Sequence, residues 1–440
     1  MRHLLSSLFL CLGLPAFAQD FTTYKGHGGP VMGLVVTGDG TLASASFDNS
    51  VGVWDGAVPE WLEGHDAAVT AIAEVVNGAL VTGGDDFRVL LWHPTQGEAV
   101  EVTRHLGKVG DIAVSADGMH IASAGWDGFV NLSVFTTFMA TRENVHLPEF
   151  TTQVLKGHKS NVTAVAFAPS GGLFSASSDG TVRVWEGQSD ALTSRVIASQ
   201  GFGINQIIVT DQWLAYGALD GTTRVIDLDS GNEIADFTLD RRPILSMDHH
   251  PETGQLAIGD GEGHIMIVDT RDWRITRDFR AMRQGPVWAL AFSNDGTVIH
   301  AGGIEDVIYA WPVALLDSYD PAGGDTRSFL RDADTMSNGE RQFMRKCSIC
   351  HSLDGSPSRK AGPTLHGVFG RRAGAVPGYR YSPTLDGSDI IWDDATIDAL
   401  FDEGPDHYIP GSKMPMQVIA APQDRADLIA FLRTATQEEE

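Results

Sequence analysis

Short runs of apolar residues recur along the first three quarters of the chain, and their spacing is that of β-strands. Residues 263–268 (GHIMIV) and 287–292 (VWALAF) are two examples. Apolar runs of this length, bounded by turn-forming residues, are typical of buried strands. Near Gly339 the spacing changes to that of a helix, because Phe343 follows four positions later. The pattern therefore predicts a β-rich region followed by a helical region.

The β-rich region contains an internal repeat. A Gly-His pair precedes each of the segments SASFDNSVGVW, TGGDDFRVLLW and SASSDGTVRVW. In all three, the histidine is 21 residues before a turn aspartate, and a tryptophan follows that aspartate by six. Continued along the chain, this frame places Trp54, Trp92, Ser133, Trp185, Ile226, Val268 and Trp311 at the tryptophan position. The sequence therefore predicts seven repeats.

The repeat resembles the WD-repeat family, in which each unit is one four-stranded blade of an all-β propeller. The resemblance implies a seven-bladed propeller over residues 19–315. It also implies a hydrogen-bonded His, Ser or Thr, Asp and Trp network inside a blade. The matching sets are His27, Ser44, Asp48, Trp54; His65, Thr82, Asp86, Trp92; and His158, Ser175, Asp179, Trp185. The third repeat has His105, Ser123 and Asp127 but Ser133 in place of the indole, and repeats five to seven keep little of the motif.

The ends of the repeat region predict how the ring closes. The seventh repeat stops near Trp311 after its third strand, whereas the segment FTTYKGH near the start has the pattern of a fourth strand. We expect residues 21–25 to complete the last blade, which pairs an otherwise open sheet edge.

The first 18 residues have the features of a secretory signal peptide. A basic Arg2 precedes the apolar run from 4 to 14, and Ala16-Phe17-Ala18 provides a small-residue cleavage site. Cleavage after Ala18 and a periplasmic location are therefore expected. The residues after Cys11 do not form a convincing lipoprotein cleavage box. No other apolar run reaches membrane length, so no membrane span is expected.

Net charge narrows the range of partners. The chain has a formal net charge of −26, of which residues 19–336 carry −23 and residues 337–440 only −4. A surface this acidic is not expected to bind nucleic acid or anionic lipid by charge. It could attract basic partners.

Two of the three cysteines lie in the segment RKCSICHSL, as Cys347 and Cys350, with His351 directly after. This C-x-x-C-H spacing is typical of covalent haem attachment, with the histidine as an iron ligand. A redox dithiol would need a βαβ context, and a zinc site would need two further ligands at short spacing. Neither context is present in the sequence, so we predict one covalently bound haem c.

From Gly339 to about Thr436 the chain resembles class I cytochrome c. The segments CSICH, GPTLHGVFGR, PGYRYS, IIW, YIPGSKM and RADLIAFL occur in the family's order and near its spacing. The resemblance implies an all-α domain over residues 335–440, joined to the propeller by a connector over 316–334. It also implies that the first helix crosses the last, with Gly339 and Phe343 facing Leu428 and Phe431.

The same resemblance implies a set of haem contacts. The sixth iron ligand would be Met414, with Met416 as its competitor two positions away. The supporting residues would be Pro363, whose carbonyl orients the ligand imidazole, Arg371, Tyr381 and Trp392 at the propionates, and the Ser412 hydroxyl. The chain departs from the family by having Leu400 and Phe401 near a common tyrosine position, and Leu385 at a common asparagine position.

These features predict a non-catalytic periplasmic protein that carries single electrons, with the propeller as a scaffold for docking redox partner proteins. Basic residues near the haem edge could guide such partners, or dock on the acidic propeller: Arg345, Lys346, Arg359, Lys360 and Lys413. One alternative is a multi-centre oxidoreductase with a second redox or substrate site in the propeller. Another is a redox-gated sensor.

Two further features of the repeat region have both a structural and a functional interpretation. Four histidines could suggest a metal in the propeller channel, but they share no ligand spacing: His249, His250, His264 and His300. About ten extra residues near 136–152 form either a longer loop or a docking loop.

Overall fold

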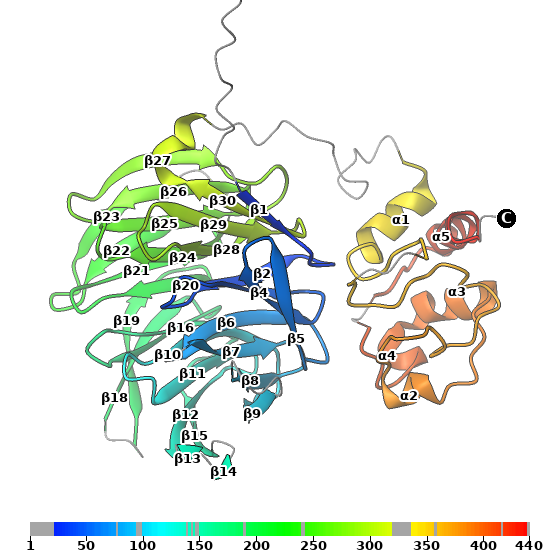
Figure 1. The fold of residues 1–440 in the computed structure, drawn as a ribbon, viewed down its shortest axis with the longest axis horizontal. Helices are drawn as coiled ribbons and strands as arrows, with labels where there is room; N and C mark the ends of the chain where they lie inside the picture. The colour runs from blue at the N-terminus through cyan, green and yellow to red at the C-terminus, as the bar shows by residue number, and fades with distance from the viewer. Residues whose placement is uncertain are drawn as a thin grey trace, which may run out of the picture.

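The computed structural model describes most of the chain as two domains (Figure 1). The described residues are 22–75, 78–93, 99–137, 140–141, 144–145, 149–187, 191–238, 243–318, 336–355, 359–414 and 417–437. The expected signal peptide and most of the expected connector lie outside them. Of the helices in this described part, none combines the length and apolar character that crossing a bilayer requires.

The first domain contains seven four-stranded antiparallel sheets, which confirms the seven-bladed propeller. Blades 1 to 4 are formed by β2 (Val31–Val36), β3 (Leu42–Ser46), β4 (Ser50–Asp55) and β5 (Val58–Glu63); β6 (Val69–Val75), β7 (Ala79–Gly84), β8 (Arg88–Trp92) and β9 (Ala99–Arg104); β10 (Val109–Val114), β11 (His120–Gly125), β12 (Phe129–Thr137) and β15 (Glu149–Lys156); and β16 (Val162–Phe167), β17 (Leu173–Ser177), β18 (Thr181–Glu186) and β19 (Thr193–Ser199).

Blades 5 to 7 follow the same order. They are formed by β20 (Ile204–Val209), β21 (Trp213–Ala218), β22 (Thr223–Asp227) and β23 (Glu233–Asp236); β24 (Ile244–His250), β25 (Gln255–Asp260), β26 (His264–Asp269) and β27 (Arg274–Arg280); and β28 (Val287–Phe292), β29 (Val298–Gly303), β30 (Val307–Pro312) and β1 (Thr22–Lys25). A small hairpin of β13 (Ala140–Thr141) and β14 (Asn144–Val145) lies within the extra residues of blade 3.

The ring closes as expected, because β1 pairs with β30 in antiparallel register from Thr22↔Ala310 to Lys25↔Val307. A 3₁₀ helix, η2 (Val313–Ser318), follows β30. Its Leu316 is buried in the core of blade 7, so the propeller fold continues through this residue.

Strand register confirms the repeat frame in all seven blades, including those without the motif. The residue at the tryptophan position always pairs with an aliphatic residue of the preceding strand. The pairs are Trp54↔Leu42, Trp92↔Leu80, Ser133↔Ile121, Trp185↔Leu173, Ile226↔Leu214, Val268↔Leu256 and Trp311↔Ile299.

The hydrogen-bonded network forms where the motif is complete. In blade 4, His158 Nδ1 lies 3.1 Å from an Asp179 carboxylate oxygen, and His158 Nε2 lies 2.8 Å from Ser175 Oγ. Trp185 Nε1 donates to the same hydroxyl at 2.9 Å. Burial lowers the pKa of His158, so the imidazole is neutral and links the carboxylate to the hydroxyl. Blades 1 and 2 contain the same network.

The second domain is helical in its described residues. Its helices are α1 (Asn338–Lys346), α2 (Pro383–Asp386), α3 (Asp394–Glu403), α4 (Pro405–Tyr408) and α5 (Pro422–Ala435). Helix α1 crosses α5 closely at Gly339, where an added Cβ would lie 2.0 Å from the carbonyl oxygen of Asp427. The Phe343 and Phe431 rings meet beside the crossing at 5.7 Å, and Leu428 is fully buried. The predicted helix crossing is therefore present.

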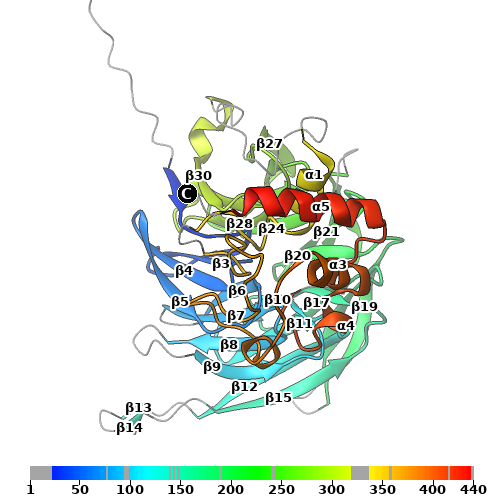
Figure 2. The same cartoon turned by 90° about the vertical axis from the view of Figure 1, so that its right-hand side faces the viewer.

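The two domains lie against each other. Figures 1 and 2 show the helical domain against one face of the propeller, near the strands of blades 1 and 2. This face carries the turn between the second and third strands of each of these blades.

Candidate functional site

The helical domain surrounds a cavity of about 560 Å³, a volume typical of small-molecule and cofactor sites. Most of the side chains that line it are apolar. The structure brings all nine predicted site residues to this one cavity. They are Cys347, Cys350, His351, Pro363, Arg371, Tyr381, Trp392, Ser412 and Met414.

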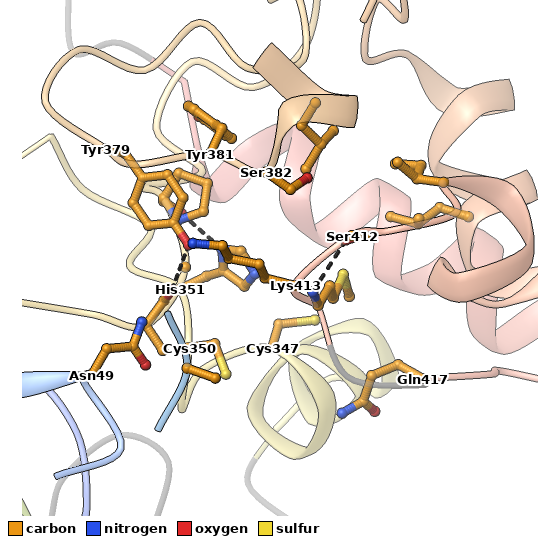
Figure 3. Close-up of a pocket in the computed structure, with 18 of the residues that line it drawn as sticks. Asn49, Cys347, Cys350, His351, Tyr379, Tyr381, Ser382, Ser412, Lys413 and Gln417 are labelled. Atoms are coloured by element: carbon orange, nitrogen blue, oxygen red, sulfur yellow. Dashed lines mark hydrogen bonds between the residues drawn. The ribbon is translucent and has the colours of Figure 1, made fainter. Parts of the chain in front are cut away.

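The two cysteines reach the cavity from the end of α1. Cys347 caps the helix, and the amides of Cys350 and His351 both donate to its carbonyl, at 3.0 and 2.9 Å. This tight turn places both thiols and the imidazole in the same site (Figure 3). The cysteines are free, and burial raises the pKa of the Cys347 thiol to about 12 and that of Cys350 to about 11. A redox dithiol needs a lowered thiol pKa, so this environment does not favour the dithiol interpretation.

The imidazole of His351 is fixed by its neighbours. Its Nδ1 lies 2.7 Å from the carbonyl oxygen of Pro363, which leaves Nε2 as the free ring nitrogen. Burial lowers the pKa of His351, which favours the neutral form that binds metals. At Gly362 an added Cβ would lie 2.4 Å from the ring, so only glycine fits beside it.

The methionine segment is positioned by a short turn. The amide of Met414 donates to Ser412 Oγ at 3.1 Å, and both residues line the cavity. The Ser412 hydroxyl therefore holds the backbone that carries the Met414 thioether. The competing Met416 lies outside the described residues.

The cavity also contains polar groups suited to an anionic partner. Arg371 donates to the carbonyl oxygens of His366 and Thr364, at 2.6 and 2.7 Å, and burial lowers its pKa. Ser382 is 4% exposed, and its Oγ has no hydrogen-bond partner among the described residues. A guanidinium half removed from water and an unpartnered hydroxyl both fit a carboxylate such as a haem propionate.

Sequence reasoning missed Tyr379 and Ser382. The Tyr379 hydroxyl donates to the carbonyl oxygen of Ala361 at 2.6 Å, and burial raises the pKa of the phenol to about 12. Both residues belong to the segment PGYRYS, so that motif was the available signal. Leu385, Leu400 and Phe401 line the cavity with apolar side chains at the positions where the chain departs from the family pattern.

Loops of propeller blades 1 to 3 complete the lining of the cavity. Their side chains include Phe47, Asn49, Asp66, Phe87, Lys108 and Trp126. Figure 3 shows Asn49 reaching the site of Cys350 and His351 from the propeller. The candidate site is therefore formed by both domains.

Ion pairs connect the two domains at this site. Arg359 Nη2 lies 2.6 Å from Glu63 Oε1, and the Arg359 guanidinium stacks 4.2 Å from the Trp61 ring. Asp66 Oδ1 lies 3.0 Å from Lys413 Nζ and 3.3 Å from Arg380. Of the basic residues considered from the sequence, Arg359 and Lys413 make these contacts.

The other expected basic residues have different environments. The ammonium group of Lys360 donates to the carbonyl of Ser348 at 3.0 Å, Lys346 lines the cavity, and Arg345 is exposed. Arg380 was not predicted.

Two of the four propeller histidines make defined contacts within the fold. His250 bonds Thr253 through Nδ1, its Nε2 donates to the carbonyl of Asn294 in a neighbouring loop, and His249 packs edge-on against Trp213. Across the part of the chain that the structure describes, there is no group of three or more His, Cys, Asp or Glu residues that could hold a metal.

Comparisons with known proteins match the propeller and the helical domain to two different families. The family described as "WD domain, G-beta repeat" matches residues 19–55, 59–93, 98–132 and 150–186, and the family described as "Cytochrome c" matches residues 336–436. The propeller resembles the crystal structure of the WD40 beta propeller domain of Doa1 with a TM-score of 0.56 and 16% identity, over 66% of this chain and 94% of that one. This likeness shows the fold.

Curated relatives match the helical domain. Cytochrome c of Sesamum indicum is 44% identical over 102 residues, which cover 23% of this chain and 90% of the relative. Cytochrome c of Nigella damascena is 40% identical over 101 residues, or 23% of this chain and 89% of the relative. Cytochrome c of Arabidopsis thaliana is 43% identical over 100 residues, or 22% and 87%.

Proposed function

Because the chain belongs to the cytochrome c family through residues 336–436, we propose that it carries single electrons on one covalently bound haem in the periplasm. When bound, this group supplies a reversible Fe(II)/Fe(III) couple. The propeller serves as a scaffold for docking redox partners. Family membership supports the haem and electron transfer.

The residues of the cavity are assigned to distinct tasks in this proposal. Cys347 and Cys350 would hold the haem through thioether bonds, and His351 and Met414 would bind its iron. The main support is the bond between His351 Nδ1 and the Pro363 carbonyl, because it leaves Nε2 free for iron in the same cavity as both thiols. Arg371, Tyr381, Trp392 and the newly found Ser382 bind the propionates and exclude water, while Ser412 orients the methionine segment.

An absorption spectrum of the exported, mature protein tests the proposal. We expect the bands of one low-spin c-type haem per chain, with the iron content equal to the protein content. A second bound redox group, found by mass analysis, would favour the multi-centre oxidoreductase instead. Colourless mature protein would contradict the proposed carrier.

The choice between the two methionines needs a matched pair of variants. Met414→Ala should abolish the weak near-infrared band that a methionine–Fe(III) bond gives, and should lower the reduction potential because the thioether favours ferrous iron. Met416→Ala should leave both unchanged. The reverse result would assign the ligand to Met416.

Export can be tested separately. We expect the periplasmic fraction to contain a chain that begins at Gln19. Mature protein found only in the cytoplasm would contradict the proposed location.

A further inference from the structure

The opening of the cysteine-lined cavity faces the propeller. The residues that meet it come from the β3–β4, β7–β8 and β11–β12 turns of three adjacent blades and from the loops that connect these blades. We call Phe47, Asn49, Asp66, Phe87, Lys108 and Trp126 the docking face. In the proposed function, the residues beneath this face surround the haem. The edge that a partner protein would approach is therefore covered by the chain's own propeller.

Two turns of the docking face, those of blades 1 and 2, differ from their equivalents in blades 3 to 5. The residue after the turn aspartate has a positive φ in five blades. It is glycine in blades 3, 4 and 5, as Gly128, Gly180 and Gly221, but Asn49 in blade 1 and Phe87 in blade 2. A left-handed conformation is unfavourable for a bulky side chain such as phenylalanine. Asn49 and Phe87 both line the cavity, and Phe87 is the strained residue of the two. The turn of blade 3 has Gly128 and reaches the cavity through Trp126.

Gly28 of blade 1 lies at a second contact between the propeller and the helical domain. The residue after the repeat histidine donates its amide to the turn aspartate in each of the first four blades, where it is Gly28, Asp66, Leu106 and Lys159. The turn therefore accommodates several side chains. At Gly28, however, an added Cβ would lie 1.7 Å from the carbonyl oxygen of Arg359. The backbone of the helical domain rests directly on this position.

The ion pairs around the docking face are partly exposed to solvent, so they hold the two domains together only weakly. Glu63 and Asp66 pair with Arg359, Arg380 and Lys413, and each pair has at least one side chain that is about a third exposed or more. Exposed ion pairs contribute little and are weakened by salt.

We propose that the docking face is a gate for the chain's own electron carrier. In the closed arrangement it covers the cavity opening, and a protein partner exchanges electrons only after the two domains separate. The closed contact itself is independent of haem, whereas the gating of electron transfer rests on the proposed function.

Gly28→Leu tests the gate in the full-length chain. The leucine should fit the propeller, because Leu106 occupies the equivalent position in blade 3 with its side chain exposed. It should prevent docking, because its Cβ overlaps the Arg359 backbone. Lys159→Leu is the matched control, since it places the same side chain at the equivalent turn of blade 4, which does not line the cavity.

The first measurement reports docking without reference to haem. A water-soluble carbodiimide joins neighbouring amines and carboxylates, and Lys413 Nζ lies 3.0 Å from Asp66. Peptide mapping should find the Asp66–Lys413 amide in the wild type and in Lys159→Leu, and its loss in Gly28→Leu. Equal yields in all three proteins would overturn the closed arrangement.

The second measurement reports gating. Reduced protein is mixed with an oxidised blue-copper protein, and the loss of ferrous absorbance is followed. Gly28→Leu should react about tenfold faster than the wild type at low salt, as expected when the open state is a minor population. The ratio should fall toward one at high salt, and Lys159→Leu should match the wild type. Loss of the amide without faster oxidation would overturn the gate.

The two measurements distinguish failure of the proposed electron-carrier function from failure of the proposed docking. Protein without haem would give no ferrous signal in any variant, which contradicts the proposed function, yet the cross-link would still report whether the domains dock.

Discussion

The propeller fills its interior with its own side chains, whereas the helical domain packs around a cavity. Val31, Leu90 and Ile299 are fully buried in clusters shared between strands and neighbouring blades. In the helical domain, the cluster around Phe343 and Leu428 borders the 560 Å³ cavity instead. Protein interiors are normally close-packed, so a space of this size indicates that the domain is completed by a bound group.

The complete networks of the propeller blades pair their own polar groups. In blades 1, 2 and 4, the histidine and tryptophan of each network meet the same hydroxyl, and the histidine also meets the turn aspartate. In the helical domain the Ser382 hydroxyl has no partner among the described residues. Buried atoms without a hydrogen-bond partner also occur in the described propeller, as at Thr223 Oγ1 and His300 Nδ1, so it is the cavity that distinguishes the helical domain. We therefore expect the helical domain, and not the propeller, to depend on a bound group for its stability. Mutations can test this difference.

The largest effect is expected from Cys347→Ala/Cys350→Ala. Losing covalent attachment should leave the cavity without the group that its apolar lining packs against, so this domain should lose a large part of its buried apolar contact. A small domain has a total stability of only about 5–15 kcal/mol, so such a loss can unfold it. We expect complete loss of the covalent haem absorbance and of the helical circular dichroism of this domain.

The propeller provides the internal control for this double variant. Nine of the ten tryptophans lie in it, so tryptophan fluorescence reports mainly on the propeller. Its unfolding transition should be retained. A helical domain that stays folded without haem would contradict the contrast between the domains, as would joint unfolding of both.

A smaller effect is expected from removing one hydroxyl of a blade network. Ser175→Ala should leave His158 Nε2 and Trp185 Nε1 without their partner in a fully buried site. Each unsatisfied buried group costs about 1–3 kcal/mol, so loss of the partner of two groups should lower the stability of the propeller by about 2–6 kcal/mol. Denaturant unfolding followed by tryptophan fluorescence measures the change.

Blade 3 supplies the matched control, because it lacks the indole. Ser123→Ala removes the partner of His105 alone, since Ser133 at the tryptophan position bonds Thr152 at 2.7 Å instead. We expect about half the loss seen for Ser175→Ala, with the haem spectrum unchanged in both variants. Equal losses would show that the indole contributes nothing to the network.

Much of the propeller could be predicted because its information is local and repeated. The fixed spacing identified Ile226 and Val268 as equivalents of Trp54, although neither resembles tryptophan, and the strand register agrees. Closure by residues 22–25 followed from counting strands. A repeated strand pattern carries this information even where individual side chains have changed.

The sequence indicated that the two domains carry charges that attract each other, but it did not indicate where they meet. Excess acid in the propeller and basic residues near the cysteines suggested attraction, but not which blades would take part. The contact of Gly28 with Arg359 joins positions more than 300 residues apart and leaves no periodic signal. Arg380 and Ser382 were missed for a related reason, because their roles depend on the orientation of a loop rather than on spacing.

The smallest effect concerns a buried carboxyl group in the propeller itself. Asp111 of β10 accepts the amide of Val165 in the next blade at 3.0 Å. Asp248 of β24 accepts the amide of Phe292 in blade 7 in the same way, whereas Thr163 uses an uncharged hydroxyl to reach the carbonyl of Ile204 in its neighbouring blade. Burial raises the pKa of Asp111 to about 7, although the backbone bonds from Val165 and Ile112 oppose the rise. The close-packed propeller therefore contains a site that is unfavourable for charge.

This raised pKa predicts a pH dependence of definite sign. Between the unfolded pKa of about 3.9 and about 7, the folded state holds a proton that the unfolded state has released, so stability falls as pH rises through this window and then levels off. Asp111→Asn should reduce that slope, leaving the part due to Asp248, whose pKa burial also raises. It should stabilise the propeller by on the order of 1–3 kcal/mol at pH 8, with no gain at pH 4. Asp117→Asn in the same blade is the control, because a hydrogen bond from Ser115 lowers the pKa of that exposed carboxyl group. If the stability of both variants depends on pH from 4 to 8 as that of the wild type does, Asp111 is ionised in the folded propeller. The propeller would then contain a buried charge, contrary to what its close packing predicts.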